Sequence, residues 1–240
     1  MQKTTDIYEP EYVKRLFNHM SRSYERMNLI TSFGFSFLWR KQFIKKLKAS
    51  NKPLKAMDLL SGLGENWTLL AKRYPKAHLF ALDFSDKMVK KSRHKDIVQT
   101  HKRFEILQQN LLENNLKSGE YNVVTCAFGL KTFNEGQIDF LAKTIYRILA
   151  ADGTFSFIEI SAPDNKFLYA FYKFYLGRII PLLGCLFLGN PSDYKMLWTY
   201  TSRFKNCRQV QEIFKRNGLA VNYNKYFFGC ATGVTGKKPL

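Results

Sequence analysis

The stretch MDLLSGLGENW, residues 57–67, places a glycine-rich bend directly after a short apolar run. In open α/β folds such a bend follows the first strand, opens a helix and lies where a nucleotide cofactor docks. We therefore predict that residues 56–60 form a buried strand and that the bend belongs to a cofactor site.

The bend does not match either of two common phosphate-binding loops. A dinucleotide site requires G-x-G-x-x-G, and Gly62 and Gly64 fit this pattern, but the third position is Trp67. No G-K-[ST] follows, which excludes a Walker P-loop. Glu65 at the predicted helix start would repel a pyrophosphate, and with Asp58 on the preceding strand it favours a cofactor that carries positive charge.

Asp83 ends the second predicted strand, 21 positions after Gly62. At this spacing a carboxylate accepts hydrogen bonds from ribose hydroxyls. A positively charged nucleoside offers a ribose to Asp83 and positive charge to Asp58 and Glu65. S-adenosyl-L-methionine is such a ligand, because it carries a ribose, an ammonium and a sulfonium. In the alternative interpretation, Gly62 and Gly64 only turn a corner and Asp83 caps a helix that begins at Phe84.

Apolar runs alternate with helix-like stretches along most of the chain, which predicts a doubly wound, seven-stranded, mostly parallel α/β sheet of the Rossmann-like class. The helix over residues 137–153 is predicted to end at Gly153. The last two strands are separated by Gly229 and are expected to pair as an antiparallel edge hairpin. The predicted strands are residues 56–60, 78–83, 104–109, 121–128, 153–160, 219–228 and 230–238.

At 240 residues, the chain is expected to form one domain. We divide it into an N-terminal helical cap (1–50), a cofactor-binding core (51–163 and 203–240) and a helical lid (164–202), with cap and lid over the carboxyl edge of the sheet. Residues 167–189 are apolar enough to suggest a membrane span. Lys173, Arg178 and Pro181 interrupt the run, so a helical lid or interfacial element is expected, with a buried helix pair as the alternative.

The formal charge of +19 predicts attraction to anionic polymers or lipid surfaces, with a solvated basic face as the alternative. The four cysteines are dispersed without a CxxC pair, and no histidines cluster, which predicts free thiols and no zinc site. The N-terminus lacks the apolar core of a secretory signal, so we expect a cytoplasmic protein, with peripheral association at the inner face of the membrane left open. Nucleic acid is not expected, because "CAFGL" lacks the Asn/Asp-Pro-Pro-aromatic pattern of amino-methyltransferases.

Several ordered motifs resemble the S-adenosylmethionine-dependent C-methyltransferases of ubiquinone and menaquinone biosynthesis, from about Val13 to Lys238. The similarity begins at "SRSYERMNLITSFGFSFLWRK" and continues through "DLLSGLGE", "ALDFSDKMV", "VVTCAFGL", "TIYRILAADG", "IEIS" and "FYKFYLGRIIPLLGCLFLGNPSDYKML" to "TGVTGKK". The resemblance implies an enzyme of the methyltransferase class that uses S-adenosyl-L-methionine.

The resemblance also implies roles for individual residues. Asp83 would bind the ribose, residues 62–64 would lie along the methionine part of the cofactor, Asn110 would hold the adenine side, and Asp58 would orient the amino group. The expected cofactor-binding residues are Asp58, Gly62, Leu63, Gly64, Asp83, Phe84, Asn110, Leu111 and Ala127.

The chain departs from the family at two loops. Where the family usually reads G-G-T-G-D, this chain has Ser61, Leu63 and Glu65, so the threonine contact to the cofactor is lost. Where the family reads S-F-G-L-R-N, residues 127–132 read A-F-G-L-K-T. Lys131 keeps the positive charge of the arginine but not its bidentate fork.

Methyl transfer from a sulfonium requires alignment of donor and acceptor and a nucleophilic acceptor. The candidate catalytic residues are Tyr24 and Lys131, the latter as a base or as an ammonium that stabilises a phenolate. In the alternative, Tyr24 is a wall residue and Lys131 a surface charge. His19 is a further candidate base, with a structural role on an apolar helix as the alternative.

The predicted function is methylation of a hydrophobic aromatic acceptor, namely C-methylation of a prenylated quinol such as a demethylmenaquinol or ubiquinol precursor. One alternative keeps the cofactor but uses another phenolic or natural-product acceptor, or a reaction other than methylation. Another is a non-catalytic binding member of a quinone-biosynthesis complex. The sequence does not distinguish a monomer from a homodimer.

Overall fold

The computed structural model describes residues 6–101, 103–186 and 191–240. Its core is a seven-stranded sheet in the order β3-β2-β1-β4-β5-β7-β6, in which the first five strands run parallel and β7 is antiparallel to both neighbours. The predicted doubly wound fold is therefore confirmed. The strands are β1 (Lys55–Leu59), β2 (His78–Asp83), β3 (Phe104–Gln108), β4 (Tyr121–Ala127), β5 (Leu149–Ile160), β6 (Ala220–Tyr226) and β7 (Ala231–Lys237).

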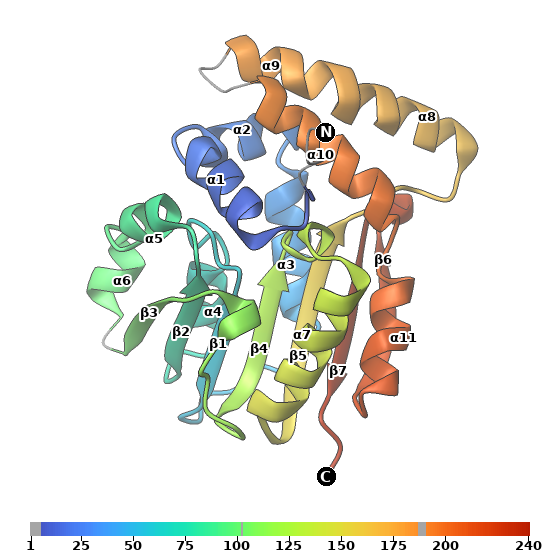
Figure 1. Cartoon of the computed structure of the whole chain (residues 1–240). Helices are drawn as coiled ribbons and strands as arrows, with labels where there is room; N and C mark the ends of the chain where they lie inside the picture. The colour runs from blue at the N-terminus through green and yellow to red at the C-terminus, as the bar shows by residue number, and fades with distance from the viewer. Residues whose placement is uncertain (1–5, 102, 187–190) are drawn as a thin grey trace.

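Helices cover both faces of the sheet (Figure 1). Successive strand residues point to opposite faces, so Phe157 of β5 packs into the core under α7 and α11, whereas Ile158 packs into a second core against α3 and α4. This double burial explains why the strands read as continuous apolar runs. The flanking helices are α3 (Phe35–Lys45), α4 (Trp67–Arg73), α5 (Asp86–Ser92), α6 (Asp96–Thr100), α7 (Glu135–Ile148) and α11 (Arg208–Arg216).

The prediction that Gly153 ends a helix is wrong. Helix α7 ends at Ile148, and Leu149 is already extended and paired with Tyr121 of β4. Gly153 instead lies inside β5, where a Cβ atom would come within 2.8 Å of the Ala150 carbonyl oxygen. The glycine is therefore required by a close backbone approach at an irregularity of the strand.

The C-terminal hairpin is confirmed, with β6 as the edge strand. Its connection is longer than the predicted single glycine and includes the short helix η4 (Phe227–Gly229). Phe227 and Phe228 have φ values of 40° and 53°, a left-handed conformation that bulky residues rarely adopt.

The remaining helices lie over the carboxyl ends of the strands (Figure 1). None of the helices in the described part of the chain is long and apolar enough to cross a membrane. The end of the apolar stretch at residues 187–189 lies outside the described residues. These helices are α1 (Pro10–Met20), α2 (Tyr24–Thr31), α8 (Lys166–Phe174), the π-helix η3 (Tyr175–Ile179), α9 (Ile180–Leu186) and α10 (Pro191–Phe204).

Candidate functional site

Two cavities meet above the carboxyl ends of β1 and β4. The first, which we call the bend cavity, is bordered by the glycine-rich bend after β1. The second, the lid cavity, has a volume of about 220 Å³ and lies under α8, η3 and α10. Four residues line both cavities: Phe17, Tyr24, Phe128 and Thr132. A ligand in one cavity can therefore reach a ligand in the other.

The structure brings six of the nine predicted cofactor residues together around the bend cavity. These six are Gly62, Asp83, Phe84, Asn110, Leu111 and Ala127. The other three lie behind the cavity wall: Asp58, Leu63 and Gly64 are almost completely buried and do not line it.

Asp83 anchors the bend. The Gly62 amide donates to Asp83 Oδ2 over 2.8 Å, and the Ser85 amide donates to Oδ1 over 2.9 Å. Burial raises the pKa of Asp83 to about 6. The alternative helix-cap role is wrong, because α5 begins at Asp86 and Ser85 is its N-cap, accepting from the Met88 amide.

The bend needs both glycines, for different reasons. Gly62 has φ of 55° but room for a methyl group, since the nearest heavy atom, Glu65 Oε2, would lie 3.8 Å from a Cβ. Gly64 has φ of 80°, and a Cβ there would lie 2.3 Å from the ring of Trp67. The tryptophan that breaks the dinucleotide pattern therefore packs directly on the bend.

We expect Gly64→Ala to destabilise the protein more than Gly62→Ala. Both variants force an alanine into a left-handed conformation, which costs about 1–2 kcal/mol. Gly64→Ala adds the overlap with Trp67, worth a further ~1–3 kcal/mol. Urea unfolding of the two variants measures the difference, and equal losses of stability would show that Trp67 moves aside freely.

Asp58 lies in a buried polar network. Asn66 Nδ2 donates to both carboxylate oxygens of Asp58, over 3.1 and 3.3 Å, and Thr125 Oγ1 donates to Oδ1 over 2.8 Å. Arg40 of α3 donates to Asn66 Oδ1 and pairs with Glu65 at 3.5 Å. The helical cap thus contacts the bend through a buried arginine, which our sequence analysis did not identify.

Burial raises the pKa of Asp58 from 3.8 to about 6, despite its hydrogen bonds. A carboxyl group whose pKa is higher in the folded state stabilises the fold below pH 4, and this contribution is lost as the pH rises through 6. We expect the stability of the wild type relative to Asp58→Asn to fall by roughly 3 kcal/mol between pH 4 and 7.

Urea unfolding at several pH values tests this expectation. Asp139→Asn is the control with the opposite sign, since hydrogen bonds from Asn217 and Lys143 lower the pKa of Asp139 to about 2. The contribution of Asp139 is lost only as the pH falls below 4. If the difference in the free energy of unfolding between the wild type and Asp58→Asn did not change with pH, the raised pKa of Asp58 would be contradicted.

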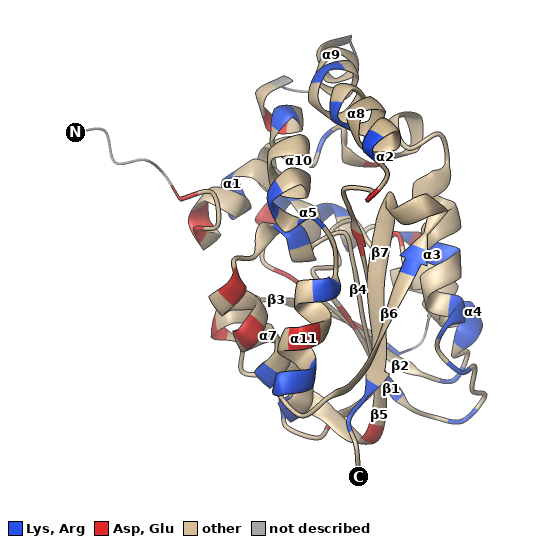
Figure 2. Ribbon diagram, turned by 90° about the vertical axis from the view of Figure 1, so that its right-hand side faces the viewer, with Lys and Arg blue, Asp and Glu red and all other residues tan. Residues whose placement is uncertain are grey.

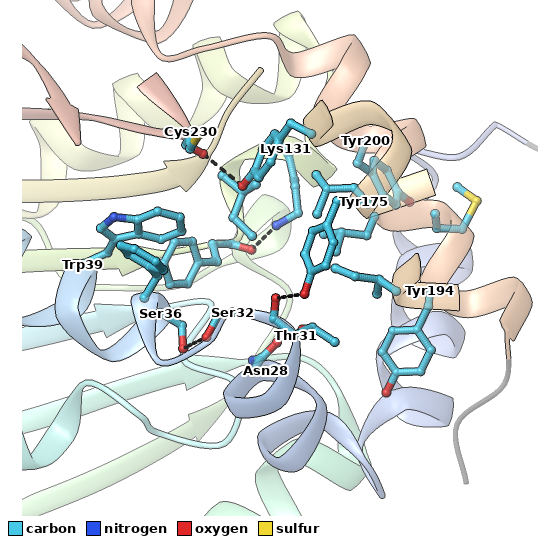
Figure 3. Close-up of a pocket in the computed structure, with 18 of the residues that line it drawn as sticks. Asn28, Thr31, Ser32, Ser36, Trp39, Lys131, Tyr175, Tyr194, Tyr200 and Cys230 are labelled. Atoms are coloured by element: carbon cyan, nitrogen blue, oxygen red, sulfur yellow. Dashed lines mark hydrogen bonds between the residues drawn. The ribbon is translucent and has the colours of Figure 1, made fainter. Parts of the chain in front are cut away.

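Lys131 is buried in the 3₁₀ turn η2 (Leu130–Thr132), with 6% of its surface exposed. Its ammonium donates to Glu159 Oε1 over 2.9 Å and to the Phe128 carbonyl over 2.7 Å, and it lies at the wall of the lid cavity (Figure 3). The alternative of a surface charge is therefore wrong. An ammonium has three hydrogens, and two are used.

Glu159 of β5 was missed by the sequence analysis. It is fully buried and also accepts from the backbone amides of Lys131 over 3.0 Å and Ile160 over 2.7 Å. A carboxylate inside the apolar strand FSFIEI was the available signal, since buried charges are paired.

Tyr24 lies where the two cavities meet. Burial, with a smaller contribution from Glu65, raises the pKa of its phenol far above the ordinary value. The hydroxyl therefore stays protonated at neutral pH and can act as a hydrogen-bond donor. His19, the further candidate base, is exposed on α1 and lines neither cavity.

The N-terminal segment also borders the bend cavity. Tyr8 and Pro10 line it, and Gln137 Nε2 donates to the Tyr8 carbonyl over 3.0 Å. Tyr200 of α10, which lines the lid cavity, donates its hydroxyl to the Ile7 carbonyl over 2.5 Å. One tyrosine thus links the lid to the segment beside the bend cavity.

All four cysteines are free thiols, as predicted: Cys126, Cys207 and Cys230 are buried and Cys185 is exposed. Within residues 6–101, 103–186 and 191–240, no group of three His, Cys, Asp or Glu side chains could hold a metal ion.

Solved structures share this fold. The chain superimposes on phosphoethanolamine N-methyltransferase 2 of Haemonchus contortus, determined with S-adenosylhomocysteine, with a TM-score of 0.65 and 12% identity, covering 93% of this chain and 60% of that longer one. It also matches a SAM-dependent methyltransferase of Aquifex aeolicus, with a TM-score of 0.57, 15% identity and coverage of 83% and 89%. At these identities the likeness shows the fold alone, which is that of class I methyltransferases.

Proteins that are related in sequence identify the family. Demethylmenaquinone methyltransferase of Lactococcus lactis subsp. lactis is 30% identical over 219 residues, which cover 90% of this chain and 85% of that protein. The enzyme of the same name from Thermotoga maritima is 29% identical, with coverage of 92% and 93%. The model of the ubiE/COQ5 methyltransferase family matches residues 4–238. The chain belongs to this family and is an S-adenosylmethionine-dependent methyltransferase.

Proposed function

We propose that the protein C-methylates a prenylated quinol of the demethylmenaquinol type. The observation that carries this proposal is the lid cavity, an apolar space of about 220 Å³ that borders the bend cavity at Tyr24, Phe128 and Thr132, with the Lys131 ammonium in its wall. A quinol needs both parts, an apolar space for its ring and tail and a polar group at the reacting end. The names of the relatives at 25–30% identity support the same acceptor class.

The residues of the bend cavity fit S-adenosyl-L-methionine. Asp83 is a buried carboxylate at the cavity wall, and no lysine or arginine of the described chain forms an ion pair with it. Each of its oxygens accepts a backbone amide and retains a lone pair for a ribose hydroxyl. Asn110 and Leu111 would hold the adenine side, and Gly62 with Ala127 the methionine side. When bound, the cofactor supplies a methyl group on a sulfonium.

Asp58 and residues 63–64 would act from behind the cavity wall. Asn66 covers both oxygens of Asp58, so Asp58 would orient the bend through Asn66 in this structure. Leu63 is buried, with 4% of its surface exposed, which supports a role in shaping the bend.

The residues at the junction would prepare the acceptor. A quinol whose hydroxyl proton has passed to solvent water is nucleophilic at the adjacent ring carbon. The Lys131 ammonium, held by Glu159, would stabilise its oxyanion through its third hydrogen, and the proton of the methylated ring carbon would then also leave to water. The protonated Tyr24 hydroxyl would donate a second hydrogen bond. Phe17 and Phe128 would hold the ring in line with the sulfonium.

We further propose that the chain forms a single domain. It consists of a helical cap (1–50), a cofactor-binding core (51–163 and 203–240) and a helical lid (164–202) over both. The protein would act in the cytoplasm, at the inner face of a membrane. Nucleic acid would not be a partner. The arrangement of lid, cap and core is compatible with a homodimer.

The test uses the purified protein, methyl-labelled S-adenosyl-L-methionine and a membrane lipid extract from cells that lack quinone methylation. We expect label in the quinone fraction, and a synthetic demethylmenaquinol should gain the mass of one methyl group. Label in no quinone fraction would count against a quinol acceptor.

A second candidate function keeps the cofactor but uses another phenol. It is favoured by Lys131 and Thr132, which stand where the family has arginine and asparagine. The variant Lys131→Arg/Thr132→Asn discriminates between the two functions. A quinol enzyme should gain activity on quinols from this change, whereas an enzyme adapted to another phenol should lose activity on its own acceptor.

A further inference from the structure

The opening of the lid cavity is formed by exposed aromatic side chains. Phe33, Phe171 and Phe227 line the cavity, yet they expose 78%, 59% and 47% of their surfaces. Side chains that both line a cavity and face solvent mark its mouth. Phe228, 80% exposed, adjoins Phe227 with ring centroids 5.5 Å apart. We call these four phenylalanines the aromatic rim.

The rim joins three segments that are distant in the sequence. Phe33, between α2 and α3, stacks on Tyr175 of η3 with centroids 5.8 Å apart, and Phe171 of α8 lies 6.3 Å from the same ring. Phe227 of η4 lies 4.5 Å from Phe35. The exposed rings therefore form one face around the cavity mouth, and soluble domains rarely leave such a face without a partner.

The chain around the rim is basic. Residues 29–48 and 165–180 contain no aspartate or glutamate. Figure 2 shows Lys and Arg on α3 and α8 and no acidic residue on either helix. Lys41, Lys166, Lys173 and Arg178 are exposed, and none of them forms an ion pair with any residue that the structure describes.

We infer that the aromatic rim inserts into the surface of an anionic lipid bilayer, with these four cations on the lipid headgroups, so that the lid cavity opens into the membrane. Exposed aromatic rings, together with unpaired cations on the neighbouring elements α3, α8 and η3, match the apolar edge and negative charge of such a surface. A second copy of the chain fits less well, because a two-fold interface would bring the same cations together. The inference rests on the proposed function, since it gives a lipophilic acceptor a route into the cavity.

Vesicle sedimentation of the full chain tests this inference. The protein should sediment with vesicles that contain phosphatidylglycerol and much less with phosphatidylcholine alone. Phe33→Ser/Phe228→Ser should lower the partition coefficient by at least about tenfold. The matched control is Phe140→Ser, which removes a phenylalanine 40% exposed on α7, away from the rim, and should leave binding unchanged.

The cations have their own test. Lys41→Gln and Lys173→Gln should each weaken binding to anionic vesicles by about fivefold and leave binding to neutral vesicles unchanged. The inference is overturned if the wild type does not bind anionic vesicles. It is also overturned if Phe33→Ser/Phe228→Ser and the control Phe140→Ser bind these vesicles equally well. It is also overturned if the rim variants abolish a dimer in analytical ultracentrifugation. These measurements need no acceptor, so failure of quinol methylation would leave them unaffected.

Discussion

Asp83→Asn is expected to weaken binding of S-adenosyl-L-methionine by about 100-fold, because each hydrogen bond to a charged group contributes about 1.5–3 kcal/mol. The asparagine keeps one acceptor oxygen but places an NH₂ group where Oδ1 or Oδ2 now accepts a backbone amide. Either orientation turns one of these contacts into a clash of two donors. The ribose would also lose the charge of its acceptor. Isothermal titration calorimetry measures the change directly.

The control is Asp96→Asn, at an aspartate in the first turn of the short surface helix α6. It removes one carboxylate from the same part of the chain and should leave the cofactor affinity within twofold. If the wild type fails to bind the cofactor at all, the binding-member hypothesis gains support. If Asp83→Asn binds as tightly as the wild type, the ribose does not lie on Asp83.

Affinity should also depend on pH. The pKa of Asp83 is about 6 in the free protein, and ribose hydroxyls donate to the ionised form. Binding is therefore expected to tighten as the pH rises through 6 and to level off above 7. This dependence should be weaker in Asp83→Asn, because the variant lacks the carboxyl group that accepts from the ribose. A smaller dependence should remain, because Asp58 is another buried carboxyl group with a pKa of about 6.

The fold followed from the sequence because both faces of the sheet are covered. Strands buried on two sides must be continuously apolar, so the runs at β1, β2 and β4 could be recognised without knowing their neighbours. The end of α7 could not be recognised in this way. Leu149 leaves the helix because it pairs with Tyr121, and that partner is 28 positions away.

The cofactor residues were predictable where local geometry decides them. The bend needs Gly62 and Gly64 for their positive φ values, and Asp83 ends the adjacent strand. Arg40 and Glu159 were not predictable in this way. Each acquires its role from a residue on another element, Asn66 in one case and Lys131 in the other. Spacing along the chain does not encode such pairs.

Lys131→Met is expected to destabilise the protein by about 3–5 kcal/mol, because it leaves the fully buried Glu159 without its counter-ion. It should also lower kcat by about 100-fold or more, as is typical when a donor to a developing oxyanion is removed. The control is Lys195→Met on α10, where an exposed lysine is lost and stability should change by less than about 0.5 kcal/mol.

The double variant Lys131→Met/Glu159→Gln separates the two roles of the lysine. Neutralising the carboxylate removes the unpaired charge but sets the new NH₂ group against the backbone amide of Lys131 or Ile160, so only about 1 kcal/mol of the lost stability should return in urea unfolding. Activity should not return, because no ammonium then faces the lid cavity. Lys131→Arg should keep both charges and most of the stability. If the double variant regained activity together with stability, Lys131 would be a structural residue and the oxyanion would have to be stabilised by Tyr24.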